Sequence, residues 1–276
     1  MTRELEITSA ANPRIRAAIA LRDAGERGRT GATIVDGARE LRRALDAGVD
    51  VVEAFVCDPL LAGQDARASL DALRARAVPV HHVKRAAFSK LAFGDRAEGL
   101  VAVIRLPTRP LDGLALPADP LIVVVEGVEK PGNLGAILRS ADGAGADAVI
   151  AASPRTDLAN PNVIRASAGT VFAMQVVEAP TSDVIAWLRG RSLRIVTTRV
   201  EAARRYTDAD LTGPLAIVLG TEDEGLSEHW SGPDTEAVSL PMRGIADSLN
   251  VSVTAAILLY EALRQRDHHG TERRAK

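Results

Sequence analysis

The stretch LIVVVEGVEKPGNLGAILRSADGAG, residues 121–145, determines the fold class that we expect for the second half of the chain. Residues 121–125 form a continuous apolar run rich in valine, which is typical of a strand buried on both faces of a parallel sheet. A polar segment with glycines and then a run of helical periodicity follow it. Strand and helix patterns alternate from there onward, so we predict a doubly wound α/β domain over residues 121–265.

The first 105 residues alternate in the same way on a smaller scale. The segment GARELRRALDAGVD (37–50) has helical spacing, and VVEAFVCD (51–58) has the composition of a strand. We therefore predict a small α/β domain over residues 1–105. Residues 106–120 contain four prolines and no core periodicity, which indicates a linker, and residues 266–276 are expected to form a frayed polar tail.

The composition limits the classes of protein to consider. The chain has 276 residues, of which 46% are hydrophobic and 25% charged, as in soluble globular proteins. It has neither an apolar run long enough to span a membrane nor a signal peptide, so we expect a cytoplasmic protein. The single cysteine, Cys57, is expected to be a buried small hydrophobe. The pairs His81–His82 and His268–His269 lack partners at metal-ligand spacing, so we expect surface histidines and no metal site.

Ligands of open parallel sheets bind beyond the carboxyl ends of the strands, and three such ends here are rich in polar residues and glycine. The first end has Asn133 inside a G-x-x-G pattern (132–135), and Arg139 lies about one turn into the helix that follows. This differs from the G-x-G-x-x-G pattern of dinucleotide sites, and the acid that would hold a ribose is missing after the next strand, which disfavours a nicotinamide-dependent oxidoreductase. From these residues alone, Asn133 as a helix cap and Arg139 as a solvated residue remain open alternatives.

The second and third strand ends have different characters. After Gly220 come three acidic residues, Glu222, Asp223 and Glu224, which would repel a phosphate and favour a neutral or cationic ligand such as S-adenosylmethionine. An acidic surface turn is the alternative. The third end, SLPMRGIADSLN (239–250), leads into a helix that begins near Ser248 or Asn250, either of which can serve as its N-cap.

In their order and in their residues, these clusters resemble the motifs of the SpoU class of RNA ribose 2'-O-methyltransferases. The motifs read NLGAILR (133–139), GTEDEGLS (220–227), and LPM followed by SLNVSV (240–253), and RASAG (165–169) is similar to the segment that the family has between them. The departures are Leu240, where isoleucine is commoner, and the KPG before Asn133. The resemblance implies a deep trefoil knot in the catalytic domain and a ribosomal-protein-like fold for the first domain.

The resemblance also implies an activity, namely S-adenosylmethionine-dependent methylation of a ribose 2'-hydroxyl in RNA by a homodimer, with 23S ribosomal RNA as the expected substrate. It assigns catalysis to Arg139, supported by Asn133, Glu222 and Asn250. A guanidinium gives up its proton only with great difficulty, so Arg139 is an awkward base. Two roles remain open, Arg139 as a base and Arg139 as a clamp for a neighbouring phosphate. The expected cofactor residues are Thr197, Thr198, Gly220, Leu240, Met242 and Leu249. The expected RNA residues in this domain are Arg165, Ser167 and Gly169.

A segment of the first domain, VKRAAFSKLAFGDRAEG (83–99), interleaves basic and aromatic residues, which suits phosphate contacts and base stacking in RNA. Its candidate RNA-binding residues are Lys84, Arg85, Lys90 and Arg96. The two aromatic residues, Phe88 and Phe93, are more simply explained as core residues, because only 3% of the chain is aromatic.

Two other functions stay open at this point. The first is a tRNA 2'-O-methyltransferase of the same family, and the second is an RNA-binding module without catalysis. The family also includes enzymes that protect producers of ribosome-targeting antibiotics, such as the avilamycin-resistance type, so the resemblance allows a role in antibiotic resistance.

Overall fold

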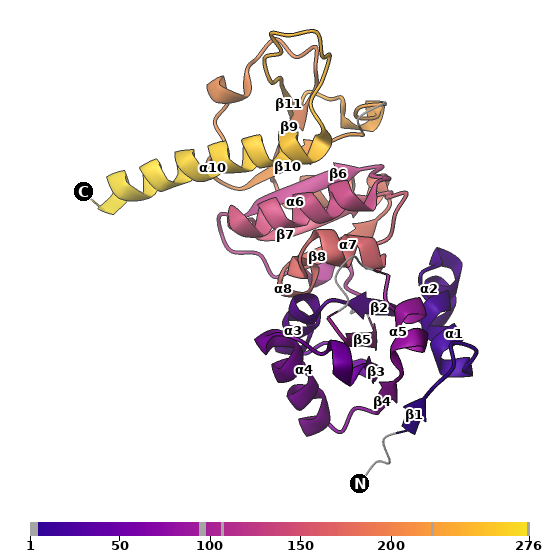
Figure 1. Ribbon diagram of the computed structural model, residues 1–276. Coiled ribbons are helices and arrows are strands. Elements are labelled where there is room, and N and C mark those ends of the chain that lie inside the picture. Colours follow the sequence, from indigo (N-terminus) through magenta and orange to yellow (C-terminus); the bar gives the residue numbers. More distant parts are fainter. Residues whose placement is uncertain (1–4, 94–97, 106–107, 222–223, 275–276) are drawn as a thin grey trace. The chain divides into compact units, whose positions relative to one another are not determined.

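The computed structural model of the chain describes residues 5–93, 98–105, 108–221 and 224–274. The chain separates into two compact units, one comprising Met1–Pro107 with Asp157–Ala173 and the other Thr108–Thr156 with Met174–Lys276. Each unit is built around its own sheet (Figure 1). Among the described helices, none has the length and apolarity needed to cross a membrane.

The sheet of the first unit has five strands in the order β1-β4-β3-β5-β2. The strands are β1 (Leu5–Ile7), β2 (Ala32–Asp36), β3 (Val51–Val56), β4 (Val80–Val83) and β5 (Leu100–Arg105). Strands β1, β4 and β3 are parallel, and β5 runs antiparallel to both β3 and β2. The sheet is therefore mixed, because its last strand, β5, runs in the opposite direction to its neighbours.

Five α-helices of the first unit connect these strands: α1 (Pro13–Ala20), α2 (Ala24–Thr30), α3 (Ala38–Asp46), α4 (Gln64–Ala75) and α5 (Arg85–Leu91). Phe55, Cys57 and Phe88 are fully buried in one apolar cluster, and Phe93 packs partly buried against it. Cys57 and Phe88 thus have the core positions expected from the sequence. His81 does not lie at the surface as expected, because it is buried and its Nε2 lies 2.9 Å from a carboxylate oxygen of Glu53.

The sheet of the second unit has six strands, all parallel, in the order β11-β9-β10-β6-β7-β8. The strands are β6 (Leu121–Glu126), β7 (Ala148–Ala152), β8 (Gln175–Ala179), β9 (Arg194–Thr198), β10 (Leu215–Leu219) and β11 (Thr235–Val238). All residues of β6, β7 and β10 are buried. This confirms the parallel α/β sheet that the apolar run at 121–125 predicts.

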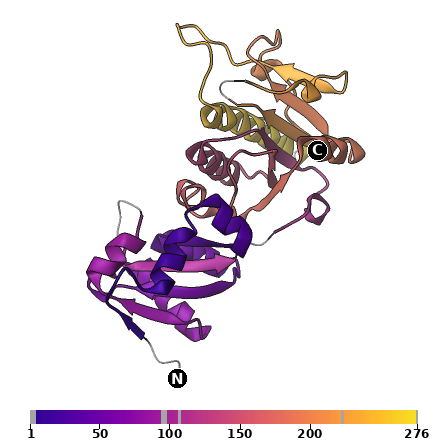
Figure 2. The ribbon, with the colours of Figure 1, turned by 90° about the vertical axis from the view of Figure 1, so that its right-hand side faces the viewer.

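Helices α6 (Pro131–Gly143) and α10 (Val251–Arg274) of the second unit lie side by side (Figures 1 and 2). Asn133 bonds to Asn250 at one end of the pair, and a Cβ on Gly143 would lie 3.0 Å from the Tyr260 hydroxyl farther along. The two helices are therefore parallel, with their N-terminal ends together. Helix α9 (Thr181–Gly190) joins β8 to β9 and packs on β7.

Helix α10 continues to Arg274, although the sequence suggests a frayed tail from residue 266. The guanidinium of Arg266 donates hydrogen bonds to four backbone carbonyls, those of Asp119, Pro120, Leu211 and Gly213. Burial lowers the pKa of this guanidinium. These contacts tie the helix to the rest of the unit at the position where fraying was expected.

Asp157–Ala173 belong to the first unit, although in the sequence they lie between two segments of the second unit. The periodicity of the sequence did not predict this. Both guanidinium nitrogens Nε and Nη2 of Arg27 donate to the carboxylate of Asp157, and Arg43 donates to the carbonyl of Ala168. The run NVIRASAGTVF forms two short helices, α7 (Pro161–Ala166) and α8 (Thr170–Ala173), instead of one. The break falls at Ala168 and Gly169, whose φ angles are positive.

Candidate active site beyond the ends of three strands

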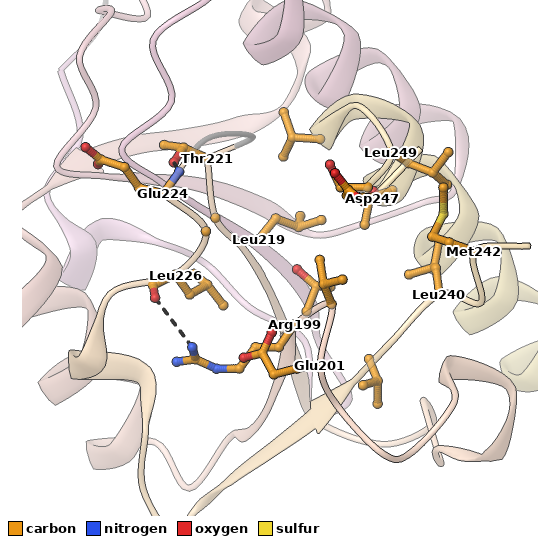
Figure 3. Close-up of a pocket in the computed structure, with 18 residues that line it drawn as sticks. Arg199, Glu201, Leu219, Thr221, Glu224, Leu226, Leu240, Met242, Asp247 and Leu249 are labelled. Atoms are coloured by element: carbon orange, nitrogen blue, oxygen red, sulfur yellow. Dashed lines mark hydrogen bonds between the residues drawn. The ribbon is translucent and has the colours of Figure 1, made fainter. Parts of the chain in front are cut away.

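Strands β9, β10 and β11 end at the rim of a cavity of about 360 Å³ in the second unit (Figure 3). Thr198, Leu219 and Val238 are the last residues of these strands, and all three line the cavity. The turn after β10, the loop after β11 and the first turn of α10 supply the remaining walls. The cavity lies at the carboxyl edge of the sheet, where parallel sheets bind their ligands.

The structure places most of the expected cofactor residues on the wall of this cavity. Figure 3 shows Leu240, Met242 and Leu249 on one side and Thr221 with Glu224 on the other. Thr198 and Gly220 also line the cavity, but Thr197 does not. Its side chain is buried and donates a hydrogen bond of 3.4 Å to the carbonyl of Glu236 in the neighbouring strand.

The turn after β10 is closed by its own hydrogen bonds. The backbone N–H groups of Thr221 and Gly225 each donate to the carbonyl of the other residue at 3.1 Å, and the N–H of Glu224 donates to the Thr221 hydroxyl at 3.0 Å. A Cβ on Gly220 would lie 2.2 Å from the carbonyl carbon of Gly225, so only glycine fits where the turn folds back. Glu222, one of the predicted catalytic residues, lies outside the described residues.

A buried carboxylate that the sequence reading missed fixes the chain after this turn. Glu126, at the end of β6, accepts hydrogen bonds from the N–H and the hydroxyl of Ser227, both at 2.8 Å. The hydroxyl of Thr181 lies 3.1 Å from the same carboxylate. An acidic residue directly after a run of buried valines was the available signal, because a buried carboxylate requires donors nearby.

Asn133 and Asn250 meet beside this cavity. Helix α6 begins at Pro131, so Asn133 occupies its third position and does not cap it. Asn250 precedes the first residue of α10, and its Oδ1 accepts from the N–H and the hydroxyl of Ser252 at 2.9 and 2.6 Å. Its Nδ2 donates to Oδ1 of Asn133 at 3.2 Å. Asn250 is therefore the cap of α10 and also a neighbour of Asn133, whereas Ser248 is not the cap.

Arg139 lies six residues after Asn133 on α6 and is exposed. It is not among the described residues that line this cavity or the smaller one next to it. An exposed guanidinium on the helix that carries Asn133 is accessible to a large ligand such as RNA. The structure thus brings together Asn133 and Asn250 but not Arg139.

The expected RNA residues of the motif RASAG lie in the first unit. The hydroxyl of the buried Ser167 donates to the carbonyl of Ile164, and a Cβ on Gly169 would lie 3.0 Å from Cα of Glu40. These contacts account for both residues without RNA. Arg165 is half-buried, and its Nη1 is buried without a hydrogen-bond partner among the described residues.

The basic residues of the segment 83–99 are placed as follows. Lys84, Arg85 and Lys90 are exposed on and just before α5. Lys84 pairs with Glu6 at 2.7 Å, and this hydrogen bond raises the pKa of its ammonium group. Arg96 lies outside the described residues.

Three acidic residues stand on the wall of the large cavity, namely Glu201, Glu224 and Asp247. The guanidinium of the basic residue there, Arg199, donates to the carbonyl of Leu226 (Figure 3). It also donates to the carbonyl of Ser227. The described residues contain no group of three or more His, Cys, Asp or Glu that could hold a metal ion. Glu224 is paired with Arg155 at 2.8 Å, so the excess negative charge on the wall comes from Glu201 and Asp247, and it favours a cation over a phosphate.

Comparison with known proteins identifies two family matches. The model of the SpoU rRNA Methylase family matches residues 120–260, which contain the whole cavity. The model of an MRM3-like substrate binding domain matches residues 12–102.

Similar proteins match along most of the chain. A 23S rRNA (uridine(2479)-2'-O)-methyltransferase of Streptomyces viridochromogenes is 32% identical over 250 residues, which are 87% of this chain and 85% of that protein. A crystal structure of an RNA 2'-O ribose methyltransferase is 43% identical, with a TM-score of 0.83 over 95% of this chain and 99% of the other. An AdoMet-bound rRNA methyltransferase from Sinorhizobium meliloti is 28% identical, with a TM-score of 0.85 over 94% of this chain and 97% of the other.

Proposed function

Because this chain belongs to the SpoU rRNA methylase family, we propose that it methylates a ribose 2'-hydroxyl of ribosomal RNA. It is an RNA 2'-O-ribose methyltransferase, and its cofactor is S-adenosylmethionine. One observation carries this conclusion: residues of the second and third sequence motifs, 81 or more positions downstream of the first (220 − 139 = 81), form the wall of a single cavity beside Asn133.

The cavity fits the cofactor chemically. Leu219, Leu240 and Leu249 offer an apolar surface for the adenine. The carboxylates of Glu201 and Asp247 suit a positively charged ligand without phosphates. When bound, S-adenosylmethionine supplies a methyl group already activated on a positively charged sulfur. What remains for the protein is mainly to position the acceptor, a contribution of potentially several kcal/mol.

We assign positioning of the acceptor to Arg139, Asn133 and Asn250. Arg139 is exposed and can hold an RNA phosphate by two parallel hydrogen bonds. A charged guanidinium carries only N–H donors and no acceptor for a proton, which disfavours Arg139 as the base. The joined amides of Asn133 and Asn250 orient one another at the ends of α6 and α10. Glu222 is proposed to orient the same arginine.

We propose 23S ribosomal RNA as the substrate and the cytoplasm as the site of action. The relative named above acts on 23S rRNA, and the match of residues 12–102 to a substrate-binding domain supports RNA binding by the first unit. Lys84, Arg85 and Lys90 are exposed there, and Arg96, Arg165, Ser167 and Gly169 remain proposed contacts. A role in resistance to a ribosome-targeting antibiotic stays a prediction, to be tested by the growth of a sensitive host that expresses the gene.

A homodimer is proposed from an apolar stripe on α10. Val253 and Tyr260 are 46% and 53% exposed, and the half-buried Ile257 lies between them at helical spacing. Exposed apolar side chains in a row are typical of a protein interface. Light scattering of the wild type and of Tyr260→Lys tests this, with a dimer expected for the first and dissociation for the second.

A trefoil knot is proposed from the chain path near the cavity. The segment after β9 is held at Arg204 and Tyr206 by hydrogen bonds with Ser239, just after β11. Gln265 of α10 holds the same segment at Ala209 and Leu211. Two later parts of the chain, at Ser239 and at Gln265, thus return to the segment 204–211. A trefoil knot requires later parts of the chain to pass back to an earlier loop in this way. A crystal structure traced through residues 199–250 would decide it.

The activity is tested by methyl transfer from tritium-labelled S-adenosylmethionine to protein-free ribosomal RNA and, separately, to tRNA. We expect label in 23S rRNA at an alkali-resistant position, because a 2'-O-methyl group blocks alkaline cleavage. Label only in tRNA would favour the tRNA alternative. Binding of S-adenosylhomocysteine and RNA without any transfer would indicate a binding module.

Arg139→Lys tests the proposed role of the guanidinium, because it keeps the charge and removes the two-pronged geometry. We expect a large loss of methyl transfer with unchanged affinity for S-adenosylhomocysteine. Transfer close to that of the wild type would contradict both roles of Arg139, as clamp and as base.

A further inference from the structure

Arg155, in the loop after β7, borders a second and smaller cavity of about 70 Å³. This cavity adjoins the cofactor cavity, since the two share Gly220, Thr221, Glu224 and Val251 on their walls. Its other walls include Asn133 and Lys130 at the start of α6. It therefore lies where the proposed function requires the acceptor nucleotide to approach the cofactor.

The backbone of Arg155 is fixed in place. Its N–H donates to the carbonyl of Val128 at 2.9 Å, and the N–H of Thr156 donates to the same carbonyl at 3.2 Å. The loop after β7 is thereby fastened to the loop after β6. The side chain that leaves this anchored position is 53% exposed.

The guanidinium of Arg155 lies between two carboxylates. Nη2 is 2.8 Å from an oxygen of Glu224, and Nη1 is 3.7 Å from an oxygen of Glu129, which is too long for a hydrogen bond. Both acidic side chains are 69% exposed. Exposed pairs of this kind are only weakly stabilising, so another anion can replace the carboxylate at little cost.

The pair is not needed to hold the turn that carries Glu224. That turn is already closed by the two backbone hydrogen bonds between Thr221 and Gly225 and by the bond from Glu224 to the Thr221 hydroxyl. The pair does determine where the guanidinium points, and it neutralises an acidic residue at the mouth of the small cavity. An RNA phosphate that approaches this rim needs a positive charge, and an arginine presents two parallel donors to it.

We propose that Arg155 binds a phosphate of the RNA next to the acceptor nucleotide, and that Glu224 holds its guanidinium ready until the phosphate replaces the carboxylate. This inference rests on the proposed function, because it uses the same cavity and the same substrate class. It adds a phosphate contact in the loop after β7, outside the three sequence motifs.

The experiment compares Arg155→Gln, Arg155→Lys, Glu224→Gln and the double variant Arg155→Gln/Glu224→Gln in the full-length protein. Arg189→Gln is the matched control, because Arg189 forms an exposed pair with Asp234 and lines neither cavity. In vitro transcribed 23S rRNA is the RNA probe. The measurements are its Kd at several KCl concentrations, KM and kcat for RNA, and the Kd of S-adenosylhomocysteine.

We expect Arg155→Gln to raise the Kd and KM for RNA about tenfold. The slope of log Kd against the logarithm of the KCl concentration should fall by about one, because one phosphate contact is lost. Arg189→Gln should leave the Kd, the KM and this slope unchanged. Arg155→Lys should recover part of this loss, because it keeps the charge but not the two parallel donors. Glu224→Gln should tighten RNA binding about threefold, but only while Arg155 is present. The affinity of the two Arg155 variants for S-adenosylhomocysteine should stay within about twofold, because Arg155 does not line the cofactor cavity.

Unchanged RNA affinity in Arg155→Gln would overturn the inference. So would equal weakening of S-adenosylhomocysteine binding by Arg155→Gln and Glu224→Gln, because that is the result expected of a purely structural pair. A wild type that binds S-adenosylhomocysteine but methylates no RNA would overturn the proposed function, and this inference with it. A wild type that methylates RNA with all variants equally active would overturn the inference alone.

Discussion

The side-chain amide of Asn250 donates a hydrogen bond to the side-chain oxygen of Asn133 across 3.2 Å, although 117 positions separate the two residues. The bond joins the N-terminal ends of two parallel helices at the edge of the cofactor cavity. Asn250 simultaneously caps its own helix through Oδ1. One residue thus combines a local structural contact with a contact to the first motif, and each half of its amide serves one of them.

Two substitutions of Asn250 separate these contacts. Asn250→Ala removes the cap and should lower the free energy of unfolding by about 1 kcal/mol. Asn250→Asp keeps an acceptor for the N–H of Ser252, so its stability should be close to that of the wild type. Asp loses the donor to Asn133, whose amide must turn to donate instead. We therefore expect at least a tenfold loss of kcat from Asn250→Asp, about 1.4 kcal/mol in the barrier.

The measurements are urea denaturation and steady-state methylation of the same preparations. Affinity for S-adenosylhomocysteine serves as the internal control, because neither substitution alters the cavity wall. If Asn250→Asp is as active as the wild type, Asn250 is a cap and nothing more.

For two glycines of the turn after β10, we expect the same substitution to have effects of different size. In Gly220→Ala the new Cβ would lie 2.2 Å from the backbone of Gly225, so the turn must open. We expect a loss of about 3 kcal/mol in stability and clearly weaker binding of S-adenosylhomocysteine. Gly225 has a φ of +67° with open space around it, so Gly225→Ala should cost only about 1 kcal/mol.

Thermal denaturation and calorimetric titration of the two variants provide the comparison. Similar losses of affinity in both would mean that the backbone angle at this turn matters and the close approach at Gly220 does not.

Some parts of the fold follow from local sequence. The continuous run at 121–125 requires a strand buried on both faces, and β6 is such a strand. The spacing of Val251, Ala255, Leu258 and Ala262 likewise defines the buried face of α10. In both cases the signal lies within a few residues of the element that it predicts.

Other features depend on contacts between distant residues. From the sequence, Asn133 could cap a helix or contact a distant residue. Because α6 begins at Pro131, two positions earlier, Asn133 is not the cap and contacts Asn250 instead. Arg155 reaches Glu224 across 69 positions, and nothing in the loop SPRTD indicates that contact. His81 looks like half of a polar pair in the sequence, but the register of β4 directs it into the core against Glu53. Periodicity carries no information on such pairings.

Cys57 provides a test of the core of the first unit. It is fully buried, and this burial raises the pKa of its thiol. The neutral thiol is therefore favoured in the folded state, and this stabilisation is fully present below the pKa of the unfolded thiol, about 8.5. It is lost as the pH rises through the higher pKa of the folded thiol.

We expect native protein to resist thiol reagents at pH 8, and unfolded protein to react. The free energy of unfolding of the wild type should fall relative to that of Cys57→Ala as the pH rises above about 8.5. Below that pH the variant should be less stable by a constant amount of about 1 kcal/mol, because it leaves a small cavity. Rapid modification of the native thiol would show that the core opens locally at this strand.

Glu126 provides the test of how the second motif is held. In Glu126→Ala the N–H and hydroxyl of Ser227 lose their acceptor in a buried place, which should cost about 3 kcal/mol of stability. In Glu126→Gln the amide oxygen can still accept from the N–H, and the amide nitrogen can donate to the hydroxyl oxygen. We therefore expect a smaller cost, about 1 kcal/mol.

Gly225 and Leu226 line the cavity directly before Ser227, so displacement of Ser227 should also weaken cofactor binding, and more in the alanine variant than in the glutamine variant. Calorimetric titration with S-adenosylhomocysteine and urea denaturation measure the two effects. Glu129→Ala is the matched control, because this carboxylate lies in the loop directly after Glu126 but is exposed. Its loss should change stability by less than about 0.5 kcal/mol. If Glu126→Ala binds S-adenosylhomocysteine as the wild type does, then the hydrogen bonds to Ser227 do not determine the shape of the cavity.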